Sequence, residues 1–295
     1  MSQLDPSTDP LIYPGHVGCP GCGATVAMKF ALQALGEKTM LVIPACCWAI
    51  IAGPHPQTSL KIPVLHTAFA TAGAAASGLR AALDRRGDTE TTVVAWAGDG
   101  GTFDIGFQAL SGAVERNEDF IYVCYDNEAY MNTGVQRSSA TPYGTRTTTT
   151  PGSGWKHTRK KNIVEALAAH RIPYAATASI AYPDDLIRKF QKARHLRGGS
   201  RFIHVFATCP TGWRVPTELS IRVARLAVQT HIFPLYEVED GTRYTLNAAG
   251  DRPVADYLEI QGRFKHLTEA DIAEIQEMVD EDWALLQRKV GGAAV

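Results

Sequence analysis

The chain contains the stretch Trp96-Ala97-Gly98-Asp99-Gly100-Gly101, and Tyr125-Asp126-Asn127 follows it further along. An apolar segment at residues 92–96 leads into the first stretch and predicts a β-strand. A helix-like segment follows at 105–116, and a second apolar segment at 120–124 leads to Asn127. A strand, a helix and a strand in this order predict a crossover unit whose two strands are parallel.

Such a unit brings Asp99 and Asn127 to the carboxyl edge of one sheet, where doubly wound folds bind phosphate ligands. If the two strands are neighbours, about 4.8 Å apart, the two side chains converge. Carboxylate and amide oxygens suit Mg²⁺, which usually shares its coordination shell with substrate phosphates. Gly98, Gly100 and Gly101 would let backbone N–H groups approach those phosphates closely. Gly-Asp-Gly alone is also a common turn, so the prediction of an α/β fold with a doubly wound, mainly parallel sheet rests on the whole unit.

Bulk composition narrows the class of protein. The chain has 295 residues and a formal net charge of −1, which gives no reason to expect nucleic acid or an anionic membrane as a partner. No apolar run approaches the roughly 18–20 residues of a membrane-spanning helix. The first residues lack the basic and apolar regions of a signal peptide. We therefore expect a soluble, cytoplasmic protein.

The six cysteines of such a protein are more typical of thiols or metal ligands than of disulfides. Cys19 and Cys22 lie in a glycine-rich turn before a predicted helix at 24–35. By itself this Cys-x-x-Cys pair fits zinc, a dithiol redox pair, or two ligands of an iron–sulfur cluster. Cys124 lies inside an apolar strand and is predicted to be a buried small hydrophobe.

The remaining cysteines follow predicted strands, as Asp99 does. Cys46 and Cys47 come after the apolar run at 40–43, and Cys209 comes after the run at 202–206. They are therefore expected near the same sheet edge as the diphosphate. All-thiolate ligation suits zinc as well as a [4Fe–4S] cluster. A second Cys-x-x-Cys, which would favour structural zinc, does not occur in the sequence.

The Gly-Asp-Gly stretch with its later Asn resembles the magnesium–thiamine diphosphate motif of thiamine-dependent enzymes. The resemblance implies that Asp99, the Asn127 side chain and the backbone carbonyl of Ala129 hold Mg²⁺. It also implies that the cofactor lies against Gly98, Gly100, Gly101, Thr133 and Gly134.

The order of motifs along nearly the whole chain resembles a narrower family. Cys-Pro-Gly-Cys-Gly, the cysteine near 47, the Gly-Asp-Gly unit and Cys209-Pro210-Thr211-Gly212-Trp213 occur in this order. The similarity extends to residues 130–134 and 261–267. Together they resemble the β, thiamine-binding subunit of the 2-oxoacid:ferredoxin oxidoreductases, with the pyruvate-type members most similar.

That resemblance implies a set of site residues. The cluster ligands would be Cys19, Cys22, Cys47 and Cys209. The family usually has glycine before its third cysteine, so Cys46 is the alternative to Cys47. Asn132 would lie beside the substrate, and its alternative role is a turn former before Thr133 and Gly134. A histidine at the position of His66 lies near the cofactor pocket in related subunits, and a structural role fits it as well.

The activity implied is oxidative decarboxylation of a 2-oxoacid, pyruvate first, to acyl-CoA and CO₂. Thiamine diphosphate, Mg²⁺ and a [4Fe–4S] cluster would be the cofactors, coenzyme A the cosubstrate, and ferredoxin or a cluster-bearing subunit the acceptor. The family's cofactor-activating Glu is carried by another subunit, so an obligate hetero-oligomer is expected. The alternatives are an aromatic or branched 2-oxoacid, a non-redox thiamine-dependent decarboxylase with structural zinc, and an electron-transfer or assembly subunit without thiamine diphosphate.

Two parts of the chain are distinguished by composition. Residues 1–235 carry every predicted ligand and form the expected thiamine diphosphate-binding domain. Residues 236–295 are expected to form a C-terminal arm that contacts another subunit, ending in a helix at 269–289 capped by Thr268. The segment at 138–154 is rich in Thr, Gly and Pro and is predicted to be a loop.

Overall fold

A computed structural model of the chain describes residues 10–150, 152 and 154–292. The strands are β1 (Thr39–Pro44), β2 (Val64–Thr67), β3 (Thr92–Gly98), β4 (Ile121–Asp126), β5 (Tyr174–Ser179), β6 (Arg201–Phe206), β7 (Leu235–Glu239) and β8 (Arg243–Ala248). The α-helices are α1 (Gly23–Leu35), α2 (Cys47–Ile51), α3 (Ala72–Arg85), α4 (Phe107–Glu115), α5 (Ile163–Ala168), α6 (Pro183–His195), α7 (Pro210–Trp213), α8 (Ser220–Gln229), α9 (Ala255–Leu258) and α10 (Glu269–Val290). Three further segments are a π-helix, η1 (Gly100–Ile105), and two 3-10 helices, η2 (Thr217–Leu219) and η3 (Gly262–Phe264).

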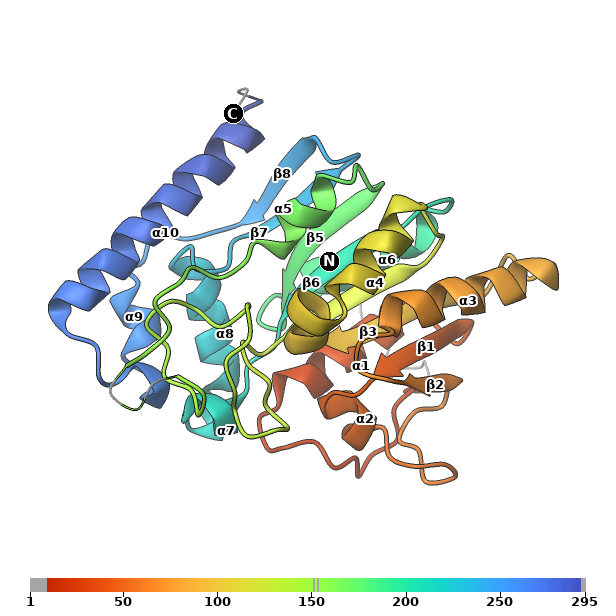
Figure 1. Cartoon of the computed structure of the whole chain (residues 1–295), viewed down its shortest axis with the longest axis horizontal. Helices are drawn as coiled ribbons and strands as arrows, with labels where there is room; N and C mark the ends of the chain where they lie inside the picture. The colour runs from red at the N-terminus through yellow and green to blue at the C-terminus, as the bar shows by residue number, and fades with distance from the viewer. Residues whose placement is uncertain (1–9, 151, 153, 293–295) are drawn as a thin grey trace.

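In the part of the chain that the structure describes, the strands form one eight-stranded sheet in the order β2-β1-β3-β4-β6-β5-β7-β8. The six strands from β2 to β5 pair in parallel, whereas β7 runs antiparallel to β5 and β8 antiparallel to β7. Helices cover both faces, with α3, α4 and α5 in front in Figure 1. The buried side chains accordingly form two clusters, one on each face of the sheet. The predicted doubly wound, mainly parallel α/β fold is confirmed.

The predicted crossover unit is present as β3, α4 and β4. The two strands are direct neighbours in parallel register, with Gly98 opposite Tyr125. The helical part begins earlier than residue 105, because η1 starts at Gly100. Its wide turn closes where the Gly106 N–H donates to the Gly101 carbonyl (2.9 Å). A Cβ at Gly106 would lie 2.2 Å from that oxygen, so only glycine fits there.

Other predicted elements also occur. The helix expected at 24–35 corresponds to α1, and the apolar runs at 40–43 and 202–206 are β1 and β6. Residues of the 138–154 segment that the structure describes form turns and coil. Cys124 is fully buried within β4, as expected. Among the described helices, none is long and apolar enough to cross a membrane.

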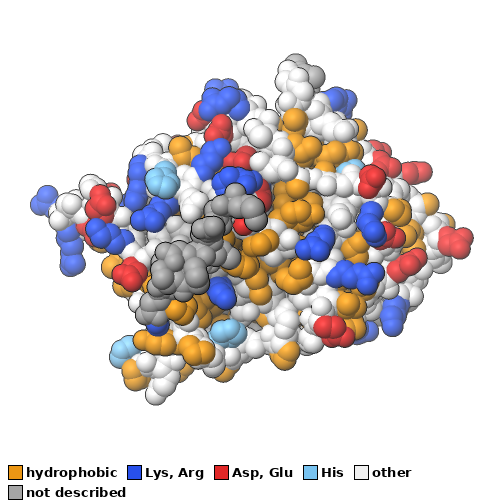
Figure 2. All heavy atoms as spheres, turned by 180° about the vertical axis from the view of Figure 1, so that it is seen from behind, with side chains coloured by type: hydrophobic (Ala, Val, Ile, Leu, Met, Phe, Trp, Pro, Cys, Tyr) orange, Lys and Arg blue, Asp and Glu red, His pale blue; other side chains and the backbone are white. Residues whose placement is uncertain are grey.

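The C-terminal part contributes both to the sheet and to an outer helix. The expected boundary at 235/236 falls at the start of β7, so β7 and β8 extend the sheet. Helix α10 begins at Glu269 with a capping box between Thr268 and Asp271, and it lies along one end of the molecule (Figure 1). On the side opposite to that of Figure 1, hydrophobic side chains gather near the centre and charges of both signs surround them (Figure 2).

A polar cluster joins the antiparallel strands to the parallel part of the sheet. The carboxylate of Glu237 on β7 accepts hydrogen bonds from Tyr174 Oη (2.8 Å), Lys192 Nζ (2.8 Å) and Asn247 Nδ2 (3.0 Å). Burial by itself would raise the pKa of Glu237, but Lys192 and Tyr174 outweigh it and hold the pKa below its ordinary value of 4.5. The ionised cluster therefore stabilises the fold above pH 4.5, and this contribution is lost as the pH falls through the lowered pKa.

We expect Lys192→Met to lower the free energy of unfolding by about 1 kcal/mol at pH 7, a value kept small because Lys192 is partly exposed. The difference from wild type should shrink as the pH falls below 4.5 and Glu237 takes up a proton. Urea titrations at several pH values measure it, with the exposed Lys38→Met as the control. A difference that stays constant down to pH 3 would contradict the role of the Glu237 carboxylate.

Candidate functional site

Three oxygen atoms converge where β3 and β4 end. Asp99 follows β3 and is 1% exposed, and Asn127 follows β4. The side-chain oxygen of Asn127 lies 3.0 Å from Asp99 Oδ1 and 3.0 Å from the carbonyl oxygen of Ala129. Turned about its axis, the amide would instead donate two N–H bonds to these atoms, which would satisfy the group without an ion.

The donor set fits Mg²⁺. In an octahedral site with bonds of 2.0–2.1 Å, neighbouring ligand oxygens lie about 2.9 Å apart. The two separations from the Asn127 oxygen, each 3.0 Å, match edges of such an octahedron. A carboxylate, an amide oxygen and a carbonyl are also ligand types that Mg²⁺ accepts.

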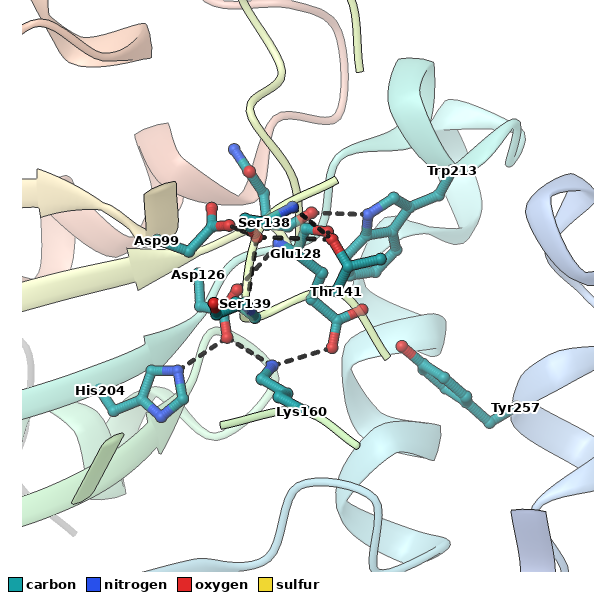
Figure 3. Close-up of polar contacts among 12 residues, drawn as sticks. Asp99, Asp126, Glu128, Ser138, Ser139, Thr141, Lys160, His204, Trp213 and Tyr257 are labelled. Carbon is teal, nitrogen blue, oxygen red and sulfur yellow. Dashed lines mark hydrogen bonds and ion pairs between the residues drawn. The ribbon is translucent and has the colours of Figure 1, made fainter. Parts of the chain in front are cut away.

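The electrostatics of Asp99 favour a cation beside it. Burial, together with the nearby carboxylate of Asp126, raises the pKa of Asp99 well above its usual range. Ser138 Oγ donates a hydrogen bond to Asp99 Oδ2 (2.6 Å) and partly offsets this (Figure 3). A bound cation would favour the ionised carboxylate much more strongly than one hydroxyl does.

A cavity of about 230 Å³ opens beside these oxygens. It is lined by the predicted site residues Gly98, Asp99, Gly100, Gly101, Asn127, Ala129, Asn132 and Thr133, and by Cys46 and Cys47. Gly134 does not line it; its carbonyl accepts a hydrogen bond from Thr148 Oγ1 (2.6 Å). His66 does not line it either and is exposed on β2. One strand edge thus gathers the predicted magnesium ligands, most of the predicted cofactor contacts and the predicted catalytic Asn132.

Sequence reasoning missed two aromatic residues of this cavity. Phe69 and Tyr130 line it and meet edge to face, with ring centroids 5.8 Å apart. Tyr130 Oη donates to Asp104 Oδ2 (3.0 Å), and its ring packs against Gly100. Tyr130 belongs to the 130–134 segment already singled out by resemblance, whereas nothing in the local sequence marks Phe69.

The cysteine-bearing segments are tied together by hydrogen bonds. The Gly23 N–H donates to the Thr208 carbonyl (2.9 Å), and Ser220 Oγ donates to the Gly21 carbonyl (2.7 Å). Trp48 Nε1 donates to the Ala24 carbonyl (3.1 Å). These bonds hold the Cys-x-x-Cys turn against the segment between β6 and α7, which contains Cys209, and against α2, which begins at Cys47.

The thiols are close enough to sense one another. Burial, together with the thiols of Cys46, Cys209 and Cys22, raises the pKa of Cys47 to about 12. Burial also raises the pKa of Cys209 to about 11, with a further contribution from Cys22 and Cys19. Thiolates here are unfavourable unless a cation compensates them, and thiolate-bound iron or zinc supplies that positive charge. As the described residues stand, no three His, Cys, Asp or Glu side chains are grouped to hold a single metal ion.

Cys46 has different surroundings. Burial raises its pKa, and its hydrogen-bond partners are Tyr125 and the backbone N–H groups of Ala49, Trp48 and Gly98. Cys47 Sγ instead lies 3.5 Å from Asn132 Oδ1. Both cysteines contact Tyr125, whereas Cys47 is the one that contacts Asn132 and whose pKa is raised by Cys22 and Cys209.

Comparisons with known proteins agree with this geometry. Residues 46–205 match the family described as thiamine pyrophosphate enzyme, C-terminal TPP binding domain. The fold and site thus define a thiamine diphosphate-binding enzyme domain.

Proteins that are similar to this chain over nearly its full length identify the family within the thiamine diphosphate-binding enzymes. The ketoisovalerate oxidoreductase subunit VorB of Pyrococcus furiosus is 53% identical over 289 residues, which cover 94% of this chain and 92% of that protein. The pyruvate synthase subunit PorB of Methanothermobacter marburgensis is 50% identical over 273 residues, covering 91% and 94%. The chain belongs to the β subunits of the 2-oxoacid:ferredoxin oxidoreductase family, as its motifs predicted.

A solved structure supports the fold. The 2-oxoglutarate:ferredoxin oxidoreductase from Magnetococcus marinus, with 2-oxoglutarate, coenzyme A and succinyl-CoA bound, superposes with a TM-score of 0.58. The alignment covers 92% of both chains at 22% identity. At that identity the likeness establishes the shared architecture.

Gly100 gives a direct test of the cofactor cavity. A Cβ at residue 100 would lie 2.3 Å from the Tyr130 ring, so Gly100→Ala should displace the ring into the cavity. We expect thiamine diphosphate affinity to fall by roughly tenfold or more, since such overpacking typically costs 1–3 kcal/mol. Calorimetric titration of the cofactor measures it. Gly78→Ala is the control, because a Cβ there meets nothing within 4 Å; equal affinities for the two variants would contradict the prediction.

Proposed function

We propose that this chain is the catalytic subunit of an enzyme that oxidatively decarboxylates a 2-oxoacid, pyruvate first, to acyl-CoA and CO₂. Electrons would leave singly through a [4Fe–4S] cluster to ferredoxin or a further redox subunit. One observation carries the proposal: Cys47 Sγ lies 3.5 Å from Asn132 Oδ1, and both residues line the cavity that contains Asp99. One proposed cluster ligand, Cys47, would therefore form part of the wall of the cofactor pocket.

The magnesium site would anchor the cofactor. Asp99, the Asn127 side chain and the Ala129 carbonyl would hold Mg²⁺, and Gly98, Gly100 and Gly101 would leave room for the diphosphate, with Thr133 and Gly134 beyond. Bound thiamine diphosphate supplies the chemistry that breaks the bond to the departing carboxylate. The Asn132 amide, exposed in the cavity, would orient the substrate and hydrogen-bond its oxygen as charge develops.

The cluster ligands would be Cys19, Cys22, Cys47 and Cys209. Cys22 and Cys209 raise the pKa of Cys47, and Cys22 and Cys19 raise that of Cys209, which supports this set with Cys47 as the third ligand. A cluster beside the cofactor is what separates an oxidoreductase from a non-redox thiamine-dependent decarboxylase with structural zinc.

The subunit would need partners to work. Among the described residues that line the cavity, Asp99 is the one carboxylate, and the magnesium site takes it. The Glu that activates the cofactor would therefore come from another subunit. Two exposed hydrophobic side chains support a subunit contact on this side of the chain. They are Ile50 (63% exposed), which lines the cavity, and Leu65 (46% exposed), which lies on the edge strand β2. Helix α10 would serve as a further contact surface.

A second candidate substrate is a branched 2-oxoacid, because relatives at 53% and 52% identity are named ketoisovalerate oxidoreductase subunits. The ratio of kcat/KM for pyruvate, 2-oxoisovalerate and an aromatic 2-oxoacid decides between them. Pyruvate as the best substrate would support the first choice.

Activity should require the assembled complex. We expect the purified chain alone, loaded with thiamine diphosphate and Mg²⁺, to show no acyl-CoA formation from 2-oxoacid, coenzyme A and a dye acceptor. The complex co-expressed with its neighbouring subunits should be active, and Asp99→Ala in that complex should lose the cofactor. Turnover by the isolated chain would contradict the missing-Glu argument.

Iron content distinguishes the two adjacent cysteines. Cys47→Ser should lower iron and acid-labile sulfide in the anaerobically purified chain, because it removes a ligand. Cys46→Ser should leave both near wild-type values, which makes it the matched control. The reverse pattern would assign the ligand to Cys46, and zinc in place of iron in the wild type would favour the non-redox alternative.

A further inference from the structure

Glu128 lies between two of the three proposed magnesium ligands, Asn127 and Ala129. It is 1% exposed and has a φ of +66°, a left-handed conformation that is uncommon outside glycine. Glu128 does not line the cavity beside Asp99. Burial of a charge and a left-handed backbone both cost free energy, so this residue calls for a structural explanation.

The left-handed turn creates the oxygen site. An extended residue at 128 would carry the chain onward by about 3.3 Å per residue and away from Asn127. Because the chain turns back at Glu128, the Ala129 carbonyl oxygen instead comes to lie 3.0 Å from the Asn127 amide. The spacing of two ligands thus depends on one backbone angle.

Every polar group of Glu128 is held. Its N–H donates to Asp126 Oδ1 (2.8 Å), and its carbonyl accepts from Thr141 Oγ1 (2.7 Å). Its carboxylate pairs with Lys160 through Oε1 (3.0 Å) and with Arg263 through Oε2 (2.5 Å). Figure 3 shows Asp126, Thr141 and Lys160 placed around Glu128. Three distant segments of the chain and the neighbouring Asp126 therefore fix one residue.

The anchors are themselves fixed. Lys160 also pairs with Asp126 Oδ2 (2.5 Å), which accepts a further bond from His204 Nε2 (2.8 Å). The Arg263 guanidinium lies 4.0 Å above the Trp213 ring, and Trp213 Nε1 donates to the Asn127 carbonyl (2.8 Å). Arg263, from η3, and Trp213, which ends α7, thus hold Glu128 and Asn127 together.

We propose that Glu128 is a positioning residue for the metal site: its clamp by Lys160 and Arg263 keeps the backbone turned so that the Asn127 side chain and the Ala129 carbonyl face one cation. This inference rests on the proposed function, which supplies the ion. If it holds, η3 helps to position the metal site through Arg263, although η3 lies far along the chain and outside the cofactor cavity.

The test measures metal binding without turnover. The assembled complex is stripped of metal, given thiamine diphosphate, and titrated with Mn²⁺ as a probe for Mg²⁺, with free Mn²⁺ followed by electron paramagnetic resonance. Glu128→Ala should weaken Mn²⁺ binding roughly 10–100-fold, the range for loss of groups that orient metal ligands. Glu128→Gly removes the same carboxylate but accepts the left-handed φ, so it should bind at least about threefold more tightly than Glu128→Ala.

Two further variants separate positioning from folding. Asp185→Ala is the matched control, because Asp185 is also buried and paired with two cations, Lys189 (2.7 Å) and Arg188 (2.5 Å), but lies on α6. It should lower thermal stability and leave Mn²⁺ affinity unchanged. Thr141→Val removes the hydroxyl that donates to the Glu128 carbonyl and accepts from the Ser138 N–H. It should weaken Mn²⁺ binding by at least about threefold, which keeps the test available if Glu128→Ala does not assemble.

Equal affinities for Glu128→Ala and wild type, or equal losses for the Ala and Gly variants, would overturn the positioning role while leaving the metal site intact. Wild-type complex that binds no Mn²⁺ with thiamine diphosphate would overturn the proposed site, and this inference with it.

Discussion

The parallel pairing of β3 with β4 is the constraint on which the rest of the site depends. With Gly98 opposite Tyr125, both strands end level with each other, and the next polar residues meet across a strand spacing. The neighbouring strands β1 and β6 end at the same edge, which brings Cys47 and Cys209 to the same region. No local sequence feature creates this site; it exists because parallel strands share one carboxyl edge.

Charge balance behind that edge explains why Asp99 suits a cation. Asp126 and Glu128 are buried, and Lys160 and Arg263 pair with them, so this network is balanced within the chain. Removing one partner of such a buried pair typically costs about 3–5 kcal/mol, which ties the network's members together. Among the described residues Asp99 forms no ion pair and has Ser138 as its hydrogen-bond partner. Its charge is therefore left for a metal to neutralise.

The sequence predicted the parts of the structure that local patterning controls. The crossover unit, its neighbours β1 and β6, and the capped helix α10 follow from apolar runs, periodicity and Thr268. The π-helix was missed because glycines read as a turn, and its closure depends on space around Gly106. Strand β5, built largely of Ala, Thr and Ser, carries a weak apolar signal. The role of Glu128 could not be predicted from the sequence. Its partners, Thr141, Lys160 and Arg263, lie far from it along the chain, and their spacing follows no known motif.

The arrangement of the cysteines gives the proposed electron path a direction. Cys47 lines the cofactor cavity, and Cys209 is partly buried at the end of β6, whereas Cys19 is exposed. A cluster held by these thiols would extend from the cavity wall to the surface, so an electron could enter beside Asn132 and leave on the side of Cys19. A structural zinc site would need no such placement against the cofactor pocket. Cys47 belongs both to the cavity lining and to the group of cysteines. This double position is the strongest structural argument for redox chemistry in this chain.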